Sequence, residues 1–270
     1  PDVVGEDEIK SRFENRGEGH WAGCRLMYFP ETGSTNIDAK KAAEEGAPEG
    51  TLVVTDCQNT GRGRRGRSWA SPKGCNLYFT LLLRPDCKPE QACMLTLVMA
   101  LAAAEAVEEL GINAGIKWPN DIVAHGKKVC GILTEMSAEP DYIHYVVIGC
   151  GINVNQMDFP EEISATATSL ALEKGERITR SALLLSIMEH FEKAYDKFRE
   201  TWDLTALLPA YHSYLLNKDA RVRVLDPKGE FCGTARGINE AGELLVEKED
   251  GELARVYAGE VSVRGVYGYV

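Results

Sequence analysis

The chain has 270 residues, of which 44% are hydrophobic and 26% charged, and its formal net charge is −11 at pH 7. This composition is typical of a soluble globular protein and argues against a disordered or fibrous chain. The negative charge disfavours general nucleic-acid binding, because proteins that bind phosphate backbones carry an excess of Lys and Arg. No apolar run reaches the roughly 18 to 20 residues of a membrane span, and the richest one, residues 94–107, predicts a core helix.

The N-terminal residues and the cysteines bear on the cellular compartment. The first residues are acidic and polar, unlike a secretory signal, so we expect a cytoplasmic protein. The eight cysteines are scattered, without a C-x-x-C pair or histidines at metal spacing. This pattern predicts reduced thiols and favours neither a disulfide framework nor a zinc site.

Helical and strand patterns alternate along the first 217 residues. In chain order they predict a short helix at 6–13, an amphipathic helix from Thr35 to Gly46, strands at 51–55 and 76–83, a long helix at 89–111, strands at 115–124, 127–136 and 142–154, and a long helix at 179–202. Thr35 and Asp38 have the spacing of a capping box. The three strands after residue 115 are joined by short turns, which favours an antiparallel meander.

The pattern changes after Asn217 to short strands separated by Pro-Lys-Gly, Ala-Gly and Asp-Gly turns. The expected strands are 220–225, 230–238, 243–249, 252–257 and 261–264. They predict a small β-barrel of about 50 residues. We therefore expect an N-terminal segment at residues 1–23, a large domain at 24–217 and a C-terminal barrel at 218–270.

A loop rich in glycine and arginine separates the strands at 51–55 and 76–83. Residues 61–69 read GRGRRGRSW and carry four arginines within six residues. Glycines let backbone N–H groups approach phosphate oxygens, and guanidinium groups neutralise and orient the phosphates. A triphosphate is therefore the expected ligand. By itself such a run also fits an RNA-binding or merely solvated loop.

Three further segments combine glycine or proline with polar side chains. They are KWPNDI at 117–122, KKVCGIL at 127–133 and GCGINV at 149–154. The first mixes a cation, an amide and a carboxylate, a combination suited to ATP and Mg²⁺, although alone it predicts only a turn. The other two alone predict a strand flanked by lysines and a strand that packs closely at its glycines.

Together, in this order and spacing, these segments and residues 33–36 (GSTN) and 71–78 (SPKGCNLY) resemble the biotin protein ligases over nearly the whole chain. The resemblance implies an α+β catalytic domain with a mixed, mainly antiparallel sheet, similar to class II aminoacyl-tRNA synthetases, and a C-terminal barrel like that of Src-homology-3 domains. It implies that ATP and Mg²⁺ activate biotin as biotinyl-5'-AMP. The biotin then passes to a lysine of the biotin carboxyl carrier domain of acetyl-CoA carboxylase or a related carboxylase.

The resemblance also implies roles for individual residues. It makes Lys128, Arg62 and Arg64 the catalytic residues, with Lys128 reaching both the biotin carboxylate and the α-phosphate. The residues implied at the biotin site are Ser34, Thr35, Asn36, Gln58 (near the carboxylate), Gly61, Arg62, Gly63, Arg64, Lys128, Gly131, Ile132 and Gly151. Those implied at the ATP and adenylate site are Arg64, Arg65, Arg67, Trp69, Lys117, Asn120 and Lys128, with Mg²⁺ bound mainly by ATP near Asn120.

Two other functions stay open at this point. A lipoate ligase or octanoyltransferase has a similar catalytic domain, but the GRGRRGRSW and KWPND forms and the barrel favour biotin. Some family members are biotin-responsive repressors that bind DNA as homodimers through an N-terminal winged helix. No helix-turn-helix pattern precedes Gly33, so we expect no nucleic-acid binding by this chain alone. We also expect no membrane binding. The resemblance to the family is the sole basis for expecting a homodimer.

Cysteine stands where the family usually has a small residue at Cys75, Cys130 and Cys150. We expect these side chains to act as small hydrophobes. A side hypothesis is that a thiol beside the ligand pocket makes the enzyme sensitive to alkylation or oxidation.

Overall fold

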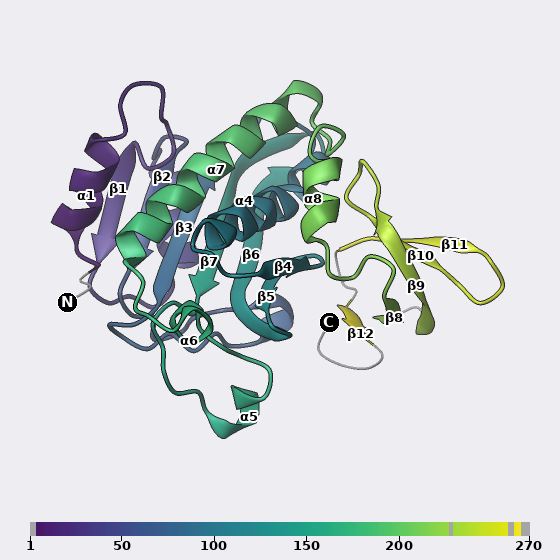
Figure 1. Cartoon of the computed structure of the whole chain (residues 1–270). Helices are drawn as coiled ribbons and strands as arrows, with labels where there is room; N and C mark the ends of the chain where they lie inside the picture. The colour runs from purple at the N-terminus through teal and green to yellow at the C-terminus, as the bar shows by residue number, and fades with distance from the viewer. Residues whose placement is uncertain (1–3, 227–228, 259–261, 266–270) are drawn as a thin grey trace.

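The computed structural model describes residues 4–226, 229–258 and 262–265 and contains two β-sheets (Figure 1). The larger sheet has the strand order β1-β2-β3-β7-β6-β5-β4. Its strands are β1 (Arg25–Phe29), β2 (Thr51–Thr55), β3 (Leu77–Leu83), β4 (Ala114–Lys117), β5 (Asp121–Ala124), β6 (Lys127–Glu139) and β7 (Tyr142–Ile152). β1 and β2 are parallel and all the other neighbours are antiparallel. The expected mixed, mainly antiparallel α+β fold is confirmed, including the meander.

Helices cover both faces of this sheet. The helices of the described residues are α1 (Glu6–Glu14), α2 (Thr35–Glu44), α3 (Pro89–Ala92), α4 (Leu95–Glu109), α5 (Glu161–Ser164), α6 (Leu170–Lys174), α7 (Arg180–Thr201) and α8 (Leu208–Tyr214). Helix α2 covers one face of the sheet, and α4 and α7 cover the other. Because successive side chains of a strand point to opposite faces, Leu81 and Leu83 pack into the main core with α4 and α7, whereas Leu82 packs beneath α2. The central strands are therefore apolar on both faces.

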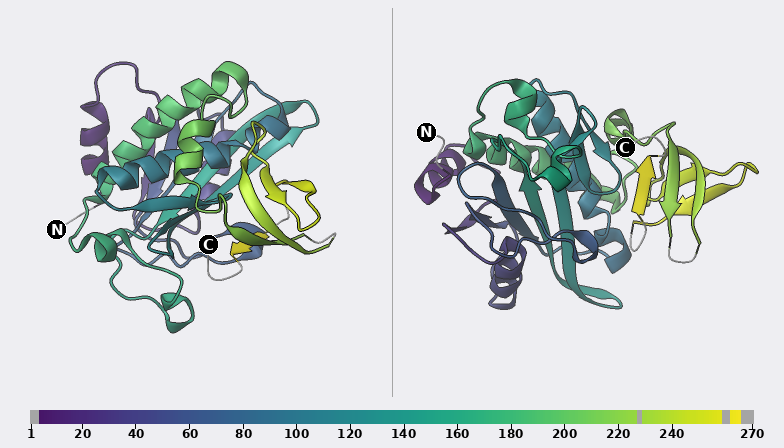
Figure 2. Two further views of the ribbon diagram at one scale, coloured as in Figure 1. Left: turned by 45° about the vertical axis from the view of Figure 1, so that its right-hand side comes forward. Right: turned by 90° about the horizontal axis from the view of Figure 1, so that it is seen from below.

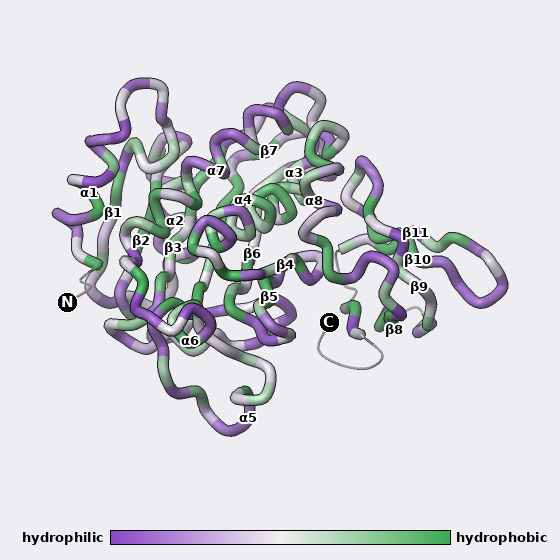
Figure 3. The backbone as a smooth tube through the Cα atoms, in the orientation of Figure 1, coloured by the Kyte–Doolittle hydropathy of each residue, from purple (hydrophilic) through white to green (hydrophobic). Residues whose placement is uncertain are grey.

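Helix α4 lies in the middle of the main core (Figure 3). The stretch Pro89–Glu109 is long and apolar enough to cross a membrane by length and composition, but 72% of its apolar window is buried inside the protein. Its alanines allow close packing against the sheet and α7. The expected core helix is thus observed.

The smaller sheet follows α8 and lies beside the larger one (Figure 2). Its strands are β8 (Arg221–Leu225), β9 (Phe231–Ile238), β10 (Leu244–Glu247), β11 (Leu253–Val256) and β12 (Ser262–Gly265), in the order β11-β10-β9-β8-β12. The expected barrel is observed as one antiparallel all-β sheet. Val261, the expected start of its last strand, lies outside the described residues.

Hydrogen bonds from Trp118 connect the two sheets. Its backbone N–H donates to Asn217 Oδ1 at 2.7 Å, and its indole Nε1 donates to the Gly242 carbonyl at 3.1 Å. Trp118 is 1% exposed. The KWPNDI segment therefore lies next to the C-terminal sheet.

Three local expectations are wrong. The helix expected at 89–111 is divided into α3 and α4, because Met94 and Leu97 donate backbone hydrogen bonds three residues back, to Gln91 and Met94, and so tighten the turn. The strand expected at 115–124 is a hairpin of β4 and β5, because Pro119 has no N–H to donate to a ladder.

The third wrong expectation is the capping box. Ser34 is the N-cap of α2 and its side chain makes no capping bond. Asp38 accepts a hydrogen bond from Thr32 at 2.6 Å, and the Thr35 hydroxyl lies against Thr80. Strand β1 and the short helices α5, α6 and α8 were not predicted, since short segments carry few periodic positions.

Candidate functional site

Two adjoining cavities open where the arginine and glycine loop crosses β6 and β7. The smaller has a volume of about 50 Å³ and the larger about 600 Å³. Both are bordered by Gly63, Arg64, Trp69, Asn120 and Lys128. These five residues therefore form the boundary between the two spaces.

Short backbone contacts fold the loop into a closed turn. Gly63 N–H donates to the Arg67 carbonyl at 2.7 Å, and Trp69 N–H donates to the Gly61 carbonyl at 2.9 Å. A Cβ at Gly61 would lie 2.4 Å from the Trp69 carbonyl oxygen, so only glycine fits there. Gly61 itself lines neither cavity, which differs from its expected place at the biotin site.

The Trp69 indole packs directly on the glycines of β6 and β7. A Cβ at Gly151 would lie 2.3 Å from Trp69 Nε1, and one at Gly131 would lie 2.9 Å from Trp69 Cζ3. Any side chain at either glycine would displace the indole. The sequence predicted close packing at the glycines of 149–154, and the structure shows both this packing and the position of Gly131 and Gly151 in the wall of the small cavity.

The small cavity gathers most residues expected at the biotin site. These are Ser34, Thr35, Asn36, Gln58, Arg62, Gly63, Arg64, Lys128, Gly131, Ile132 and Gly151. Gln58 Oε1 accepts from the Thr35 backbone N–H at 3.0 Å, and Gln58 Nε2 donates to Ser71 Oγ at 3.0 Å. Gln58 thus belongs to the Thr35 side of the cavity. The role of each residue toward a ligand stays a prediction.

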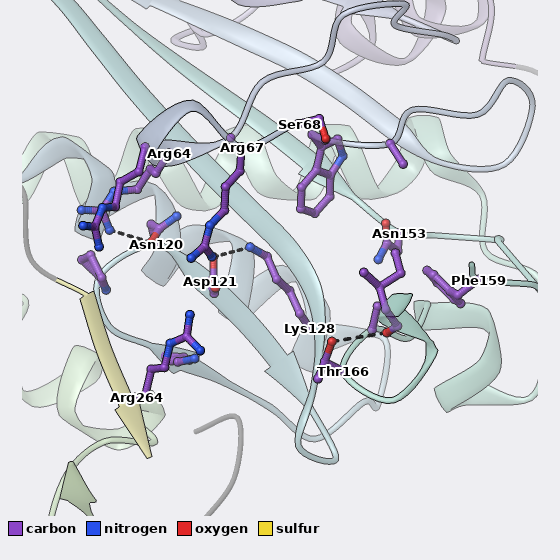
Figure 4. Close-up of a pocket in the computed structure, with 18 of the residues that line it drawn as sticks. Arg64, Arg67, Ser68, Asn120, Asp121, Lys128, Asn153, Phe159, Thr166 and Arg264 are labelled. Carbon is purple, nitrogen blue, oxygen red and sulfur yellow. Dashed lines mark hydrogen bonds and ion pairs between the residues drawn. The ribbon is translucent and has the colours of Figure 1, made fainter. Parts of the chain in front are cut away.

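The large cavity is strongly cationic. Its wall carries all seven residues expected at the adenylate site, namely Arg64, Arg65, Arg67, Trp69, Lys117, Asn120 and Lys128, and adds Arg264 from β12 (Figure 4). Six of its lining side chains are Lys or Arg, and Asp121 is the one carboxylate among the described lining residues. A protein of net charge −11 thus concentrates positive charge in one place, as an anionic guest requires.

Lys128 is held at the junction of the cavities by Asp121. Its Nζ lies 2.7 Å from Asp121 Oδ1 and 5.2 Å from the centroid of the Trp69 ring. Figure 4 shows this pair between Arg67 and Arg264. A strand residue tethered in this way keeps its ammonium group directed at both spaces.

Burial changes the protonation of a second lysine. Lys117 is 7% exposed, and burial lowers its pKa to about 8, with nearby Lys128 and Arg264 acting in the same direction and Asp121 opposing them. A lysine with this pKa loses its charge within the range in which enzymes work.

Arg64 connects the loop to both sheets. It donates to Asn120 Oδ1 at 3.0 Å and to the carbonyl of Ala258, just after β11. Asn120 Nδ2 in turn donates to the Ile132 carbonyl at 3.0 Å. The amide of Asn120 is therefore already engaged by protein groups.

Sequence reasoning missed several residues of the large cavity, among them Asp121, Phe159 and Arg264. Asp121 lies within the KWPNDI segment and its charge was a signal, because a carboxylate between lysines suggests an ion pair. Phe159 and Arg264 line the wall from distant segments. They carry no local motif, so only the fold brings them to the site.

The cysteines next to the cavities are poor nucleophiles. Burial raises the pKa of Cys130 to about 12 and that of Cys150 well above the usual value, and it also raises the pKa of Cys75. Cys150 lines the small cavity, yet both Cys130 and Cys150 are buried. Since the thiolate is the reactive form, the structure argues against the alkylation hypothesis for these two residues.

Comparison with known proteins agrees with this geometry. Residues 28–153 match the Biotin/lipoate A/B protein ligase family and residues 220–264 match the Biotin protein ligase C terminal domain. The Bifunctional ligase/repressor BirA of Bacillus subtilis is 40% identical over 97% of this chain and 80% of its own length. The biotin--[acetyl-CoA-carboxylase] ligase of Mycobacterium tuberculosis is 35% identical over 95% of this chain and 94% of its own.

A solved structure is similar over the same extent. The biotin protein ligase of Aquifex aeolicus in complex with biotin and ATP has a TM-score of 0.78 at 34% identity, covering 90% of this chain and 99% of that one. The chain therefore belongs to the biotin protein ligase family.

Proposed function

We propose that this biotin protein ligase divides its reaction between the two cavities. The small cavity binds biotin, the large one binds ATP, and biotinyl-5'-AMP forms where they meet. The observation that carries the proposal is the position of Lys128, whose side chain lines both cavities and is fixed by Asp121.

The chemistry explains why cations surround this junction. The biotin carboxylate attacks the α-phosphorus of ATP and pyrophosphate leaves, so two anions must approach each other. Lys128, Arg62 and Arg64 offset this repulsion, and the effect grows as the loop excludes water. No protein nucleophile takes part.

Trp69, Lys117, Arg65 and Arg67 complete the nucleotide side in this proposal. Trp69 offers an aromatic face to the adenine, and the three cations lie along the wall that would receive the phosphates. Ser34, Thr35, Asn36 and Gln58 surround biotin together with Gly63, Gly131, Ile132 and Gly151.

Mg²⁺ fits this site only as a partner of the nucleotide. Within the described residues no group of three or more His, Cys, Asp or Glu side chains is arranged to hold a metal ion. The Asn120 amide already bonds to Arg64 and Ile132. Mg²⁺ would thus be held mainly by phosphate oxygens, whose charge it neutralises during transfer.

The second half of the reaction transfers biotin to a lysine of a biotin carboxyl carrier domain. We propose a cytoplasmic enzyme, in keeping with the reduced cysteines, and a catalytic domain at 24–217 followed by a C-terminal domain at 218–270. A homodimer is a further possibility, tested by light scattering with and without biotin and ATP.

The test is a complete reaction with the purified chain. It is incubated with biotin, ATP, Mg²⁺ and a carrier domain, whose mass is then measured. We expect one biotin per carrier domain, and none when the acceptor lysine is replaced by arginine. Lipoate in place of biotin should leave the mass of the carrier domain unchanged; addition of lipoate and not biotin would contradict the proposal.

A further inference from the structure

The Asn36 side chain has a fixed orientation in the wall of the small cavity. Its Nδ2 donates to Glu135 Oε2 at 2.8 Å and to the Leu133 carbonyl at 3.2 Å. Both partners are acceptors, so the two N–H bonds of the amide must face them, and Oδ1 must face the other way.

Lys40 holds the carboxylate that fixes Asn36. Its Nζ lies 2.8 Å from Glu135 Oε1. Burial alone would raise the pKa of Glu135, but hydrogen bonds from Lys40 and Asn36 outweigh it and keep the pKa below its usual value. Glu135 is therefore a charged acceptor at neutral pH.

The space for this arrangement comes from the sheet. Thr80, Gly149 and Leu133 lie side by side on β3, β7 and β6, and Asn36 lies over them. A Cβ at Gly149 would come within 2.0 Å of Asn36 Oδ1. Glycine at this position lets the amide oxygen reach Thr80.

The direction of the next hydrogen bonds follows from counting protons. Thr80 Oγ1 is fully buried and lies 2.7 Å from Asn36 Oδ1 and 2.8 Å from Thr35 Oγ1. Asn36 Oδ1 has no proton, so the single hydroxyl proton of Thr80 goes to it. Thr80 Oγ1 can then only accept, and the proton between the two threonines must come from Thr35.

The Thr35 hydroxyl thus directs its proton into the protein. Its other neighbour inside the wall, Gln58 Oε1, is more distant at 3.2 Å and already accepts from the Thr35 backbone N–H. Toward the cavity Thr35 offers lone pairs. Ser34, beside it on the same wall, makes no capping bond and is not polarised in this way.

We propose that Lys40, Glu135, Asn36 and Thr80 are positioning residues that make the Thr35 hydroxyl an obligatory hydrogen-bond acceptor for the substrate. This rests on the proposed function. At neutral pH the only N–H or O–H donors of biotin are the two ureido N–H groups, so a ureido N–H meets Thr35. This places Gln58, a partner of Thr35, near the ring of biotin, whereas the sequence resemblance implied a place near the biotin carboxylate.

The experiment compares biotin with its two isomeric cyclic carbamates, in each of which one ureido N–H is replaced by oxygen. Calorimetry measures the Kd of each for the wild type, Thr80→Val and the control Thr80→Ser. In the wild type, one isomer places a ring oxygen against the lone pairs of Thr35, and we expect it to bind about 10-fold or more weakly than the other.

Thr80→Val removes the acceptor that holds the Thr35 proton. The hydroxyl then turns and donates to the ring oxygen, so the ratio of the two Kd values falls to about 1 to 3, whereas Thr80→Ser keeps the wild-type ratio. A merely structural role would weaken both isomers equally and leave the ratio unchanged.

Glu135→Gln provides a second variant if Thr80→Val fails to fold. A glutamine can place an N–H against Asn36 and so favours the turned amide, whereas the Leu133 carbonyl still opposes the turn. The polarity of the network is therefore weakened, and we expect the ratio of the two Kd values to fall part of the way toward that of Thr80→Val. Glu139→Gln, on the same strand, is its control. An equal Kd for both isomers in the wild type, or an unchanged ratio in the folded Thr80→Val or Glu135→Gln variant, would overturn the proposal. Absence of biotin binding by the wild type would instead overturn the proposed function.

Discussion

The two cavities differ in the groups that line them. The small one uses neutral hydroxyls and amides whose hydrogen bonds are fixed inside the wall, and its arginines come only from the loop that covers it. The large one uses six cationic side chains against one carboxylate. Under the proposed function, the difference means that the neutral ring of biotin is selected by the direction of hydrogen bonds, whereas the polyphosphate of ATP is selected by charge. Lys128 lines both cavities and therefore lies where the two kinds of lining meet.

Loss of Lys128 should have the largest effect. Lys128→Ala removes a preorganised cation worth about 3 to 4 kcal/mol in the transition state, so pyrophosphate release should slow about 100- to 1,000-fold. The neighbouring Lys127→Ala, which lines neither cavity, serves as the control. Near-normal release by Lys128→Ala would contradict the catalytic role proposed for this residue.

Loss of Arg64 should act on retention of the intermediate. Arg64→Ala removes the hydrogen bonds to Asn120 and Ala258 that anchor the loop, and biotinyl-5'-AMP should leave about 10-fold faster, as expected for one charge-assisted hydrogen bond. Release is followed by filtration of the preformed complex without acceptor. Arg25→Ala, an exposed arginine on β1, should release at the wild-type rate; an unchanged rate for Arg64→Ala would contradict the anchoring role.

The pH dependence of ATP use should reveal Lys117. Its pKa is lowered to about 8 by burial, so the side chain is charged below pH 8 and neutral above it. We expect kcat/KM for ATP in the free enzyme to fall above pH 8, by up to about tenfold per pH unit. In Lys117→Arg the guanidinium stays charged, so this alkaline fall should disappear. An identical pH profile in both proteins would contradict a role for the charged Lys117 side chain in binding the phosphates of ATP.

Alkylation should have the smallest effect. Iodoacetamide should modify the exposed Cys24 and Cys232 first, and leave Cys130 and Cys150 unmodified because they are buried and their pKa values are raised. Peptide mass mapping identifies the labelled thiols, and calorimetry on the same sample should show an unchanged Kd for biotin. A weakened Kd that accompanies labelling of Cys150 would restore the hypothesis of a reactive thiol in the small cavity.

Much of the larger sheet and most of the candidate site follow from local sequence patterns. The strand at 51–55 agrees with β2 because it is a short β-branched run bounded by turn residues. The helix at 179–202 agrees with α7 because its apolar side chains recur at three- and four-residue spacing along its whole length. The division of 89–111 into α3 and α4 did not follow from the sequence, because a change from four-residue to three-residue hydrogen bonds leaves the hydrophobic spacing almost the same. The hairpin around Pro119 did not follow either, because the residues on both sides of the turn continue the strand pattern.

The sequence by itself determined which family the chain resembles and which residues to expect in the site, because the glycines and cations of 61–69, 117–122 and 127–133 are contiguous motifs. Only the tertiary structure decided that Asp121 holds Lys128, that Arg264 of the C-terminal sheet lines the large cavity, and that Thr80, Gly149 and Glu135 surround Asn36. The physical reason is that hydrogen bonds and ion pairs depend on distances of a few ångströms between residues far apart in the chain. Such distances are set by the register of the strands and leave no periodic signal in the sequence.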